Sequence, residues 1–348
     1  MFDHPANRAP IYQMLSQAGQ FTGLFDSWHR SSALHADFQR ALVEAKLPDA
    51  VRTVAVSGSL GRLEVVDGSD CDLIVVLQDA ALSDVDGKLS RAAAECFELV
   101  LKAIRPLGLS ASKTGGIFSV PTSFERLCDA KSLGVVDEPM DTFGHRIQLL
   151  IDSQPVYRFD EFAMLQQSIL RRYARETIEF DGSKQWTYLL NDLIRYHRSL
   201  CVRTQWATRA DPPKWRVLNL KLWHSRLINY AGLLLLLGES SRETNDKLQW
   251  FVDRLALTPL ERVVHVLQCH TEGVASEIIE CYDRFLAAMN DAEFIVQLAD
   301  DGQSRFPDDH AAYQGLRENS RRIVSSLTRF ILDQPNEWAP QFHELLLF

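Results

Sequence analysis

Apolar residues recur in two different patterns along this chain, and the pattern changes near its middle. Short apolar runs rich in β-branched residues occupy 51–56 and 73–77, and each predicts a strand. The second run is continuous, as in a strand that is buried on both faces. A third strand is expected over 109–120. Apolar positions at helical spacing predict helices around these strands, at 10–47, 84–105, 122–131 and 140–152.

From Phe159 to the end no strand pattern is found, and the spacing predicts helices throughout. The chain is therefore expected to be α+β, with a small mixed β-sheet domain at 1–155 followed by an all-α domain at 156–348. The most apolar stretch, 227–237, is too short to cross a bilayer and is expected to be the centre of a core helix. The predicted helices of the second domain are 159–179, 185–207, 215–238, 243–255, 257–269, 274–298 and 312–333.

Composition narrows the class of protein. The chain has 348 residues, 46% of them hydrophobic and 24% charged, as in an ordinary globular protein of about two domains. A net charge of −9 argues against a dedicated nucleic-acid binder, which normally carries a basic face. Six scattered cysteines without a Cys-x-x-Cys pair fit reduced thiols, and the pattern leads us to expect neither a signal peptide nor a membrane span. We expect a cytoplasmic protein that does not associate with a membrane.

Candidate chemistry lies between the first two predicted strands. Gly58 and Ser59 interrupt the first apolar run, and glycine is frequent where a backbone must approach something closely. Asp70 and Asp72 precede the second run, and alternate residues of an extended segment point to the same side. Two neighbouring carboxylates repel each other, which favours a bound cation between them. The alternative is a solvated loop, because glycine, serine and aspartate are also typical of turns. The coincidence of strand, glycine turn and Asp-x-Asp favours a metal site.

Mg²⁺ fits this site because it binds one or two carboxylates and leaves positions for substrate phosphates. Gly58 and Ser59 can offer N–H groups and a hydroxyl to those phosphates, and Arg62 a planar cationic fork. The chemistry indicated is transfer of a nucleotidyl group from an NTP, with pyrophosphate leaving.

The segment Gly-Ser, Gly-Arg, Ser-Asp-x-Asp resembles the nucleotidyltransferase superfamily of DNA polymerase β. It is most similar to the branch of the bacterial PII-protein uridylyltransferases and their relatives. The resemblance implies that Gly58 and Ser59 hold the triphosphate, with Ser69 also at the nucleotide, and that Asp70 and Asp72 are catalytic Mg²⁺ ligands. Arg62 and Glu64 match a Gly-Arg-x-Glu variant of that branch. The similarity extends over about 40–230.

Members of the superfamily commonly have a third carboxylate on a later strand, and here the predicted third strand carries no acid. Four acids that follow it are candidates, and the sequence does not choose among them: Glu125, Asp129, Asp141 and Asp152. If none is present, the chain is expected to bind nucleotide without rapid turnover.

Polar residues on two helices of the second domain are also candidates for contact with substrate. Asn191, Arg195 and Arg198 share one face of a predicted helix, and Lys221 lies on the next. Arginine and lysine there can bind a triphosphate or an acceptor, although surface ion pairs explain them equally well.

The function predicted from the sequence is Mg²⁺-dependent transfer of AMP or UMP from an NTP, bound between the domains, to a protein or small-molecule acceptor. Nucleic acid is not the expected acceptor. Three alternatives stay open. The first is a cyclic- or oligonucleotide synthase or an antitoxin-like nucleotidyltransferase. The second is a non-catalytic nucleotide-binding regulator, and the third is an interaction module with an inactive N-terminal site.

Overall fold

The computed structural model describes residues 19–66, 68–82, 89–111, 116–175, 177–208, 210–242, 246–270, 272–300, 310–334 and 337–347. Contacts between Cα atoms divide the described residues into two compact units. The sheet unit contains residues 28–188 and 246–258, and the helical unit contains the rest.

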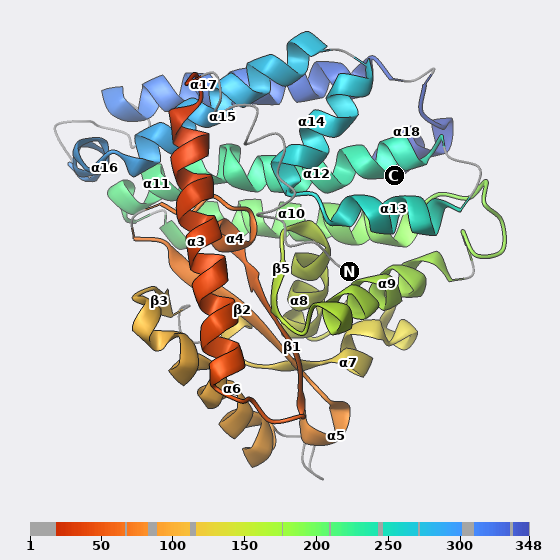
Figure 1. Cartoon of the computed structure of the whole chain (residues 1–348). Helices are drawn as coiled ribbons and strands as arrows, with labels where there is room; N and C mark the ends of the chain where they lie inside the picture. Colours follow the sequence, from red (N-terminus) through yellow and green to blue (C-terminus); the bar gives the residue numbers. More distant parts are fainter. Residues whose placement is uncertain are drawn as a thin grey trace. The chain divides into compact units, whose positions relative to one another are not determined.

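The sheet unit is built on a small mixed sheet (Figure 1). Strands β1 (Val51–Ser57) and β2 (Asp70–Leu77) form its antiparallel centre. The order is β3-β2-β1-β5, with β5 (Gln154–Tyr157) antiparallel to β1. Strands β3 (Ser110–Ala111) and β4 (Thr122–Ser123) both pair in parallel with β2. This sheet, followed by helices, confirms the α+β class.

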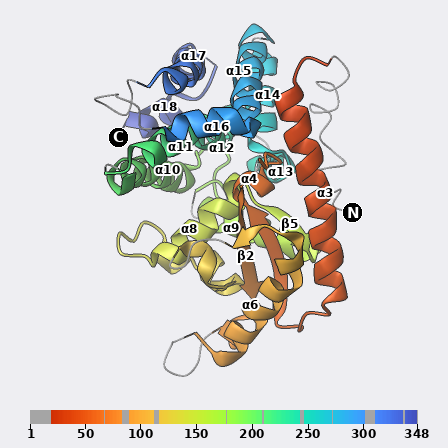
Figure 2. The same ribbon diagram turned by 90° about the vertical axis from the view of Figure 1, so that its left-hand side faces the viewer.

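Helices cover the sheet and complete its core. Phe38 and Leu42 of α3 (Thr22–Glu44) belong to one apolar cluster with residues of β1 and β2. Helix α6 (Arg91–Ile104) lies beside β2 (Figure 2). Its residue Val100 belongs to the same cluster. The other α-helices described for this unit are α4 (Gly58–Gly61), α5 (Asp79–Leu82), α7 (Phe124–Cys128), α8 (Met140–Ile151), α9 (Phe159–Ala174) and α13 (Lys247–Leu255).

The expectation of one strand over 109–120 is wrong in the part that the structure describes. Ser110–Ala111 form β3, residues 112–115 lie outside the described residues, and Ile117–Ser119 form a 3₁₀ turn. Gly116 precedes that turn in extended conformation. The run mixes apolar and polar residues and contains two glycines, which weaken a strand because they lack side chains to pack.

Strand β5 was not predicted, because it lies across the domain boundary expected at 155/156. Pro155 lies opposite Ala55 of β1, and β5 is at the edge of the sheet. An edge strand tolerates proline because it has a neighbouring strand on one side only, so the N–H that proline lacks is not needed on the other side. The units also divide the chain differently from a single boundary at 155/156. Helix α9 packs on β1 and α13 packs on α9, so both lie in the sheet unit.

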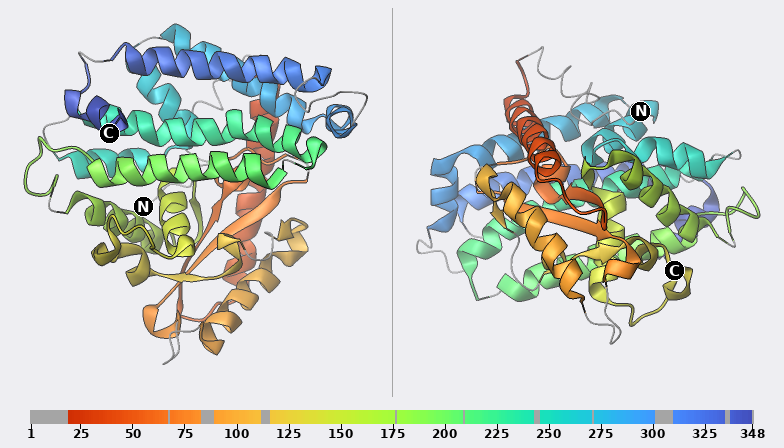
Figure 3. Two further views of the ribbon diagram at one scale, coloured as in Figure 1. Left: turned by 180° about the vertical axis from the view of Figure 1, so that it is seen from behind. Right: turned by 60° about the horizontal axis from the view of Figure 1, so that its bottom comes forward.

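The helical unit is organised around α12 (Ser225–Ser240), which packs against α11 (Pro212–Trp223) and α14 (Pro259–His270). Leu233–Leu237 are all buried, which confirms that this run is the centre of a core helix. In the view from behind, α12 runs beside α10 (Thr187–Thr208) (Figure 3). The remaining helices described here are α15 (Glu272–Asn290), α16 (Ala292–Ala299), α17 (Ala311–Leu332) and α18 (Pro340–Leu347).

One predicted helix, 215–238, is two helices that meet at His224. The ring of His224 is completely buried, stacks on Phe285 at 4.3 Å and lies 2.9 Å from the Leu220 carbonyl through Nδ1. Burial lowers the pKa of this imidazole to about 4, so the ring is neutral at pH 7. Among the described residues no helix is both long and apolar enough to cross a membrane.

Candidate functional site

The predicted site is formed where β1 ends and β2 begins. The antiparallel register places Ser57, the last residue of β1, opposite Asp72 of β2. Between them the chain forms the single helical turn α4, in which Arg62 N–H donates to the Gly58 carbonyl at 3.0 Å. The pairing therefore brings the glycine turn and the Asp-x-Asp segment to the same end of the sheet.

Gly58 lies directly against the carboxylate of Asp72. Its φ is +67°, a conformation that residues with a β-carbon rarely adopt. A β-carbon at residue 58 would also lie 2.7 Å from Asp72 Oδ2. The backbone conformation therefore favours glycine here, and a β-carbon would also force the Asp72 carboxylate to move.

Asp70 and Asp72 occupy the accessible end of an otherwise buried strand. Asp70 is exposed and Asp72 half-buried, whereas Leu73–Leu77 are fully enclosed. Cys71 between them is buried, and its thiol pKa is raised far above the usual range, first by burial and then by the charges of Asp72 and Asp70. A protonated thiol is a poor metal ligand. The metal ligands that β2 offers at this end are therefore the carboxylate oxygens of its two aspartates.

Arg62 does not point to an open surface but is buried between two acids. Its Nε donates to Glu64 Oε2 at 2.8 Å, and its guanidinium also donates to Asp152 Oδ2 at 2.7 Å. Asp152 Oδ1 accepts a hydrogen bond from the Ser57 hydroxyl at 3.1 Å. Arg62 therefore neutralises carboxylates that fix the turn to the start of β5, and its predicted role at phosphate stays a prediction.

Gly61 has the closest contact in the turn. A β-carbon at residue 61 would lie 2.2 Å from the main-chain oxygen of Asp152. The Gly-Arg pair is thus explained by one neighbour, because Gly61 admits the Asp152 backbone and Arg62 binds its carboxylate. Sequence reasoning did not find this partnership. The sequence did contain a signal. Charged residues so close to an apolar strand, here Arg62 and Glu64, imply that a further charged group is buried with them.

Ser59 and Ser69 support the loop. Ser59 is half-buried, and its carbonyl accepts from Glu64 N–H at 2.8 Å. Ser69 is buried, and its hydroxyl accepts from Val66 N–H at 3.1 Å, closing the turn that leads into β2. Both residues thus lie in the predicted loop, with contacts that hold its backbone.

Of the four candidates for a third carboxylate, Asp152 is the one in contact with β1. Glu125 and Asp129 are exposed, and Asp129 Oδ1 accepts from Lys131 N–H in a local turn. Asp141 is half-buried in the first turn of α8. Since both oxygens of Asp152 are engaged, by Ser57 and Arg62, its position favours holding the turn over activating an acceptor.

The four polar residues predicted on the helical unit differ in their surroundings. Asn191 and Arg198 are exposed, and Lys221 is half-buried. Arg195 lies 3.6 Å from Asp192 Oδ1 and forms an ion pair within its own helix. This pair lies within one helix, as the ion-pair alternative predicted, but Asp192 is buried rather than on the surface. Contact of these residues with substrate stays a prediction.

The donor set at the end of β2 suits Mg²⁺ better than a transition metal. Within the described residues no group of three or more His, Cys, Asp or Glu side chains is arranged to hold a metal. A site for Mg²⁺ needs only one or two carboxylates when phosphates and water supply the other ligands. Asp70 and Asp72 fit that requirement, as accessible hard-oxygen ligands beside a glycine turn.

Comparison with protein-family models gave no match to this chain, and comparison with curated proteins gave no similar sequence.

Proposed function

We propose that this protein is a Mg²⁺-dependent nucleotidyltransferase that transfers AMP or UMP from an NTP to a protein or small-molecule acceptor. The observation that carries the proposal is the contact between Gly58 and the Asp72 carboxylate at the accessible end of β2. It joins a glycine turn suited to phosphate and a carboxylate pair suited to a hard cation.

In this proposal an acceptor oxygen attacks the α-phosphorus, the bond from that phosphorus to pyrophosphate breaks, and the acceptor proton passes to solvent. Mg²⁺ bound at Asp70 and Asp72 would supply charge stabilisation for the attacking and leaving oxygens. Gly58 and Ser59 would orient the phosphates through the turn. Arg62, Glu64 and Asp152 would keep that turn in place, since a small displacement of a positioned phosphate costs rate.

The test measures pyrophosphate release and transfer of label from α-labelled ATP or UTP, with Mg²⁺ and with or without a cell extract as the source of acceptor. Asp70→Asn with Asp72→Asn should reduce turnover by about a hundredfold or more, because the charges that hold the cation are removed. The matched control is Asp37→Asn with Glu95→Gln, which removes two exposed carboxylates, each already in a helical ion pair. Full turnover in the first double variant would refute the proposal.

A second candidate function is nucleotide binding without turnover. It is favoured by Asp152, whose two oxygens are already bound to Ser57 and Arg62. It predicts a Mg²⁺- and NTP-dependent increase in unfolding temperature without pyrophosphate release. A soluble nucleotide product formed without acceptor would instead indicate a cyclic- or oligonucleotide synthase.

A further inference from the structure

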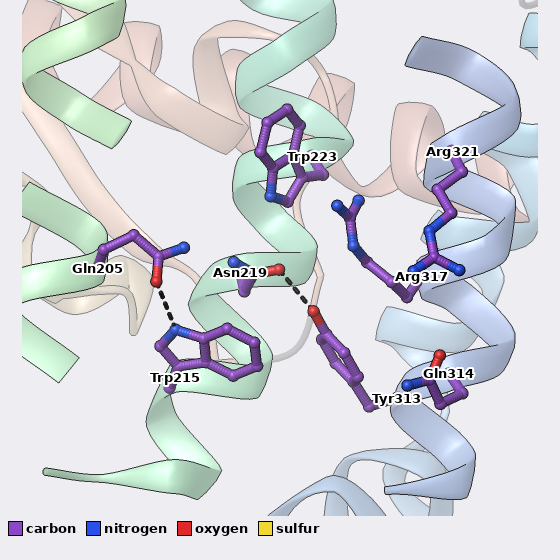
Figure 4. Close-up of a pocket in the computed structure, with 8 residues that line it drawn as sticks. All are labelled: Gln205, Trp215, Asn219, Trp223, Tyr313, Gln314, Arg317 and Arg321. Carbon is purple, nitrogen blue, oxygen red and sulfur yellow. Dashed lines mark hydrogen bonds between the residues drawn. The ribbon is translucent and has the colours of Figure 1, made fainter. Parts of the chain in front are cut away.

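A second candidate site lies within the helical unit, in a cavity of about 280 Å³. Figure 4 shows its lining, which comes from three helices: α10, α11 and α17. Of the described residues that line it, none is acidic. They are Gln205, Trp215, Asn219, Trp223, Tyr313, Gln314, Arg317 and Arg321.

One part of the lining is aromatic and rigidly held. The rings of Trp215 and Tyr313 lie 5.3 Å apart. The Tyr313 hydroxyl donates to Asn219 Oδ1 at 2.7 Å, and both of these residues are buried (Figure 4). Trp215 Nε1 donates to Gln205 Oε1 at 2.9 Å. Trp215 and Trp223 are half-buried, so part of each indole ring is accessible to a flat ligand.

The other part of the lining is cationic and comes from successive turns of α17. Arg317 is half-buried, lies 5.0 Å from the centre of the Trp223 ring and donates to Ser320 Oγ at 2.8 Å. Throughout the described chain, no carboxylate forms an ion pair with Arg317. Arg321 is 58% exposed and pairs at 3.1 Å with Glu318, which is also exposed.

This arrangement costs free energy that a bound anion would recover. Burial lowers the pKa of Arg317 and the charge of Arg321 lowers it further, while Tyr313 and Glu318 offset only part of this effect. A phosphate would neutralise Arg317 through short charge-assisted hydrogen bonds and would compete with Glu318 for Arg321. Aromatic faces next to such a pair are the usual surroundings of a stacked nucleobase.

We propose that this cavity binds a nucleoside monophosphate, with the base against the indole ring of Trp223 and the phosphate on the neighbouring Arg317 and on Arg321. The volume of about 280 Å³ lies just below the range of about 300–1,000 Å³ for small-molecule sites, so the ligand must be small, such as a single nucleotide. The site shares no residue with the end of β2, so it does not rest on the nucleotidyltransferase activity proposed above.

Isothermal titration calorimetry with AMP tests the proposal, in EDTA and with the Asp70→Asn, Asp72→Asn protein beside the wild type. These conditions remove Mg²⁺-dependent binding at the other site. We expect a dissociation constant for AMP below about 1 mM in both proteins, with adenosine and inorganic phosphate each binding at least about tenfold more weakly. Arg317→Gln should weaken AMP binding about tenfold or more.

Matched variants separate this site from general effects of charge and hydrophobicity. Arg284→Gln is the control for Arg321. Like Arg321, Arg284 is 58% exposed and paired with a helical glutamate, but it lies outside the cavity, so its loss should leave AMP binding unchanged. Trp223→Leu should weaken binding, whereas Trp206→Leu, at a position 70% exposed and outside the cavity, should not.

Circular dichroism establishes that each variant is folded, and Arg321→Gln, at an exposed position, gives a second test if Arg317→Gln does not fold. Undetectable binding of AMP, unchanged binding in Arg317→Gln and Arg321→Gln, or equal weakening in Arg284→Gln would each overturn the proposal. Inorganic phosphate binding as tightly as AMP would overturn the stacked base.

Discussion

Arg62 of the sheet unit and Arg317 of the helical unit show how differently one residue type is used in this protein. Arg62 is buried and pairs with two buried carboxylates, Glu64 and Asp152. Arg317 is half-buried, and in the described structure its guanidinium contacts an indole ring and a serine hydroxyl rather than an acid. Both sites would receive phosphate in our proposals, but among the residues that the structure describes, Arg317 has no carboxylate in an ion pair with it whereas Arg62 has two.

The difference teaches that an arginine in a phosphate-binding motif need not be the group that binds phosphate. The charge of Arg62 is neutralised by the acids that hold the turn. The groups that remain accessible to a ligand are the backbone of Gly58 and the carboxylates of β2. A metal ion would then be needed to make that surface attractive to an NTP, whereas the helical cavity is already cationic.

The largest expected effect comes from Arg62→Ala, which leaves two buried carboxylates without their counter-charge. We expect the free energy of unfolding to fall by about 3–5 kcal/mol, measured by urea denaturation. Adding Glu64→Gln and Asp152→Asn to this variant should restore part of the loss, because the stranded charges are removed. A loss no larger than that of Arg317→Ala would contradict the contrast between the two arginines.

Acidification should weaken both units, because each contains a fully buried histidine. Burial lowers the pKa of His145 in the sheet unit and of His224 in the helical unit to about 4. Between pH 6.5 and 4 the unfolded state binds more protons, so the free energy of unfolding falls as the pH falls. From pH 6.5 to 4.5 each histidine contributes a loss of about 2 kcal/mol.

The measurement is urea denaturation at several pH values, with His224→Gln as the test variant. That variant should be less stable at pH 7 and should depend less on pH between 6.5 and 4.5. An unchanged slope would show that His224 does not titrate as its burial requires.

Two glycines of the β1–β2 connection separate backbone strain from steric contact with Asp72. Gly58 and Gly68 both have positive φ, +67° and +74°, but a β-carbon at Gly68 would meet nothing within 4 Å. Gly68→Ala should therefore cost about 1 kcal/mol, and Gly58→Ala about 2–3 kcal/mol together with a loss of nucleotidyl transfer. Equal costs and equal activities would show that the contact with Asp72 is unimportant.

The smallest effect on folding is expected for Arg317→Ala. It removes a contact with Trp223 at a half-buried position and should cost at most about 1 kcal/mol in urea denaturation. Nucleotidyl transfer should be unchanged, since the variant leaves the end of β2 intact. A loss of several kcal/mol would mean that Arg317 serves the fold, as Arg62 does.

Much of the fold and part of the candidate site could be predicted from local pattern. The runs that form β1 and β2, the glycine turn between them and the buried leucines of α12 are all present in short stretches of sequence. Strand β5 could not be predicted in this way, because Pro155 is acceptable only at a sheet edge. The break at His224 also depends on distant neighbours, among them Phe285 and Asn319.

The sequence by itself determined which residues form the acidic strand end and its glycine turn, because neighbours in a chain are held close by covalent bonds. Only the tertiary structure decided that Arg62 would pair with Asp152, 90 residues later, and that α11 and α17 would place tryptophans beside arginines. The physical reason is that a buried charge takes whichever partner long-range packing places within hydrogen-bonding distance. Spacing along the chain does not encode that distance.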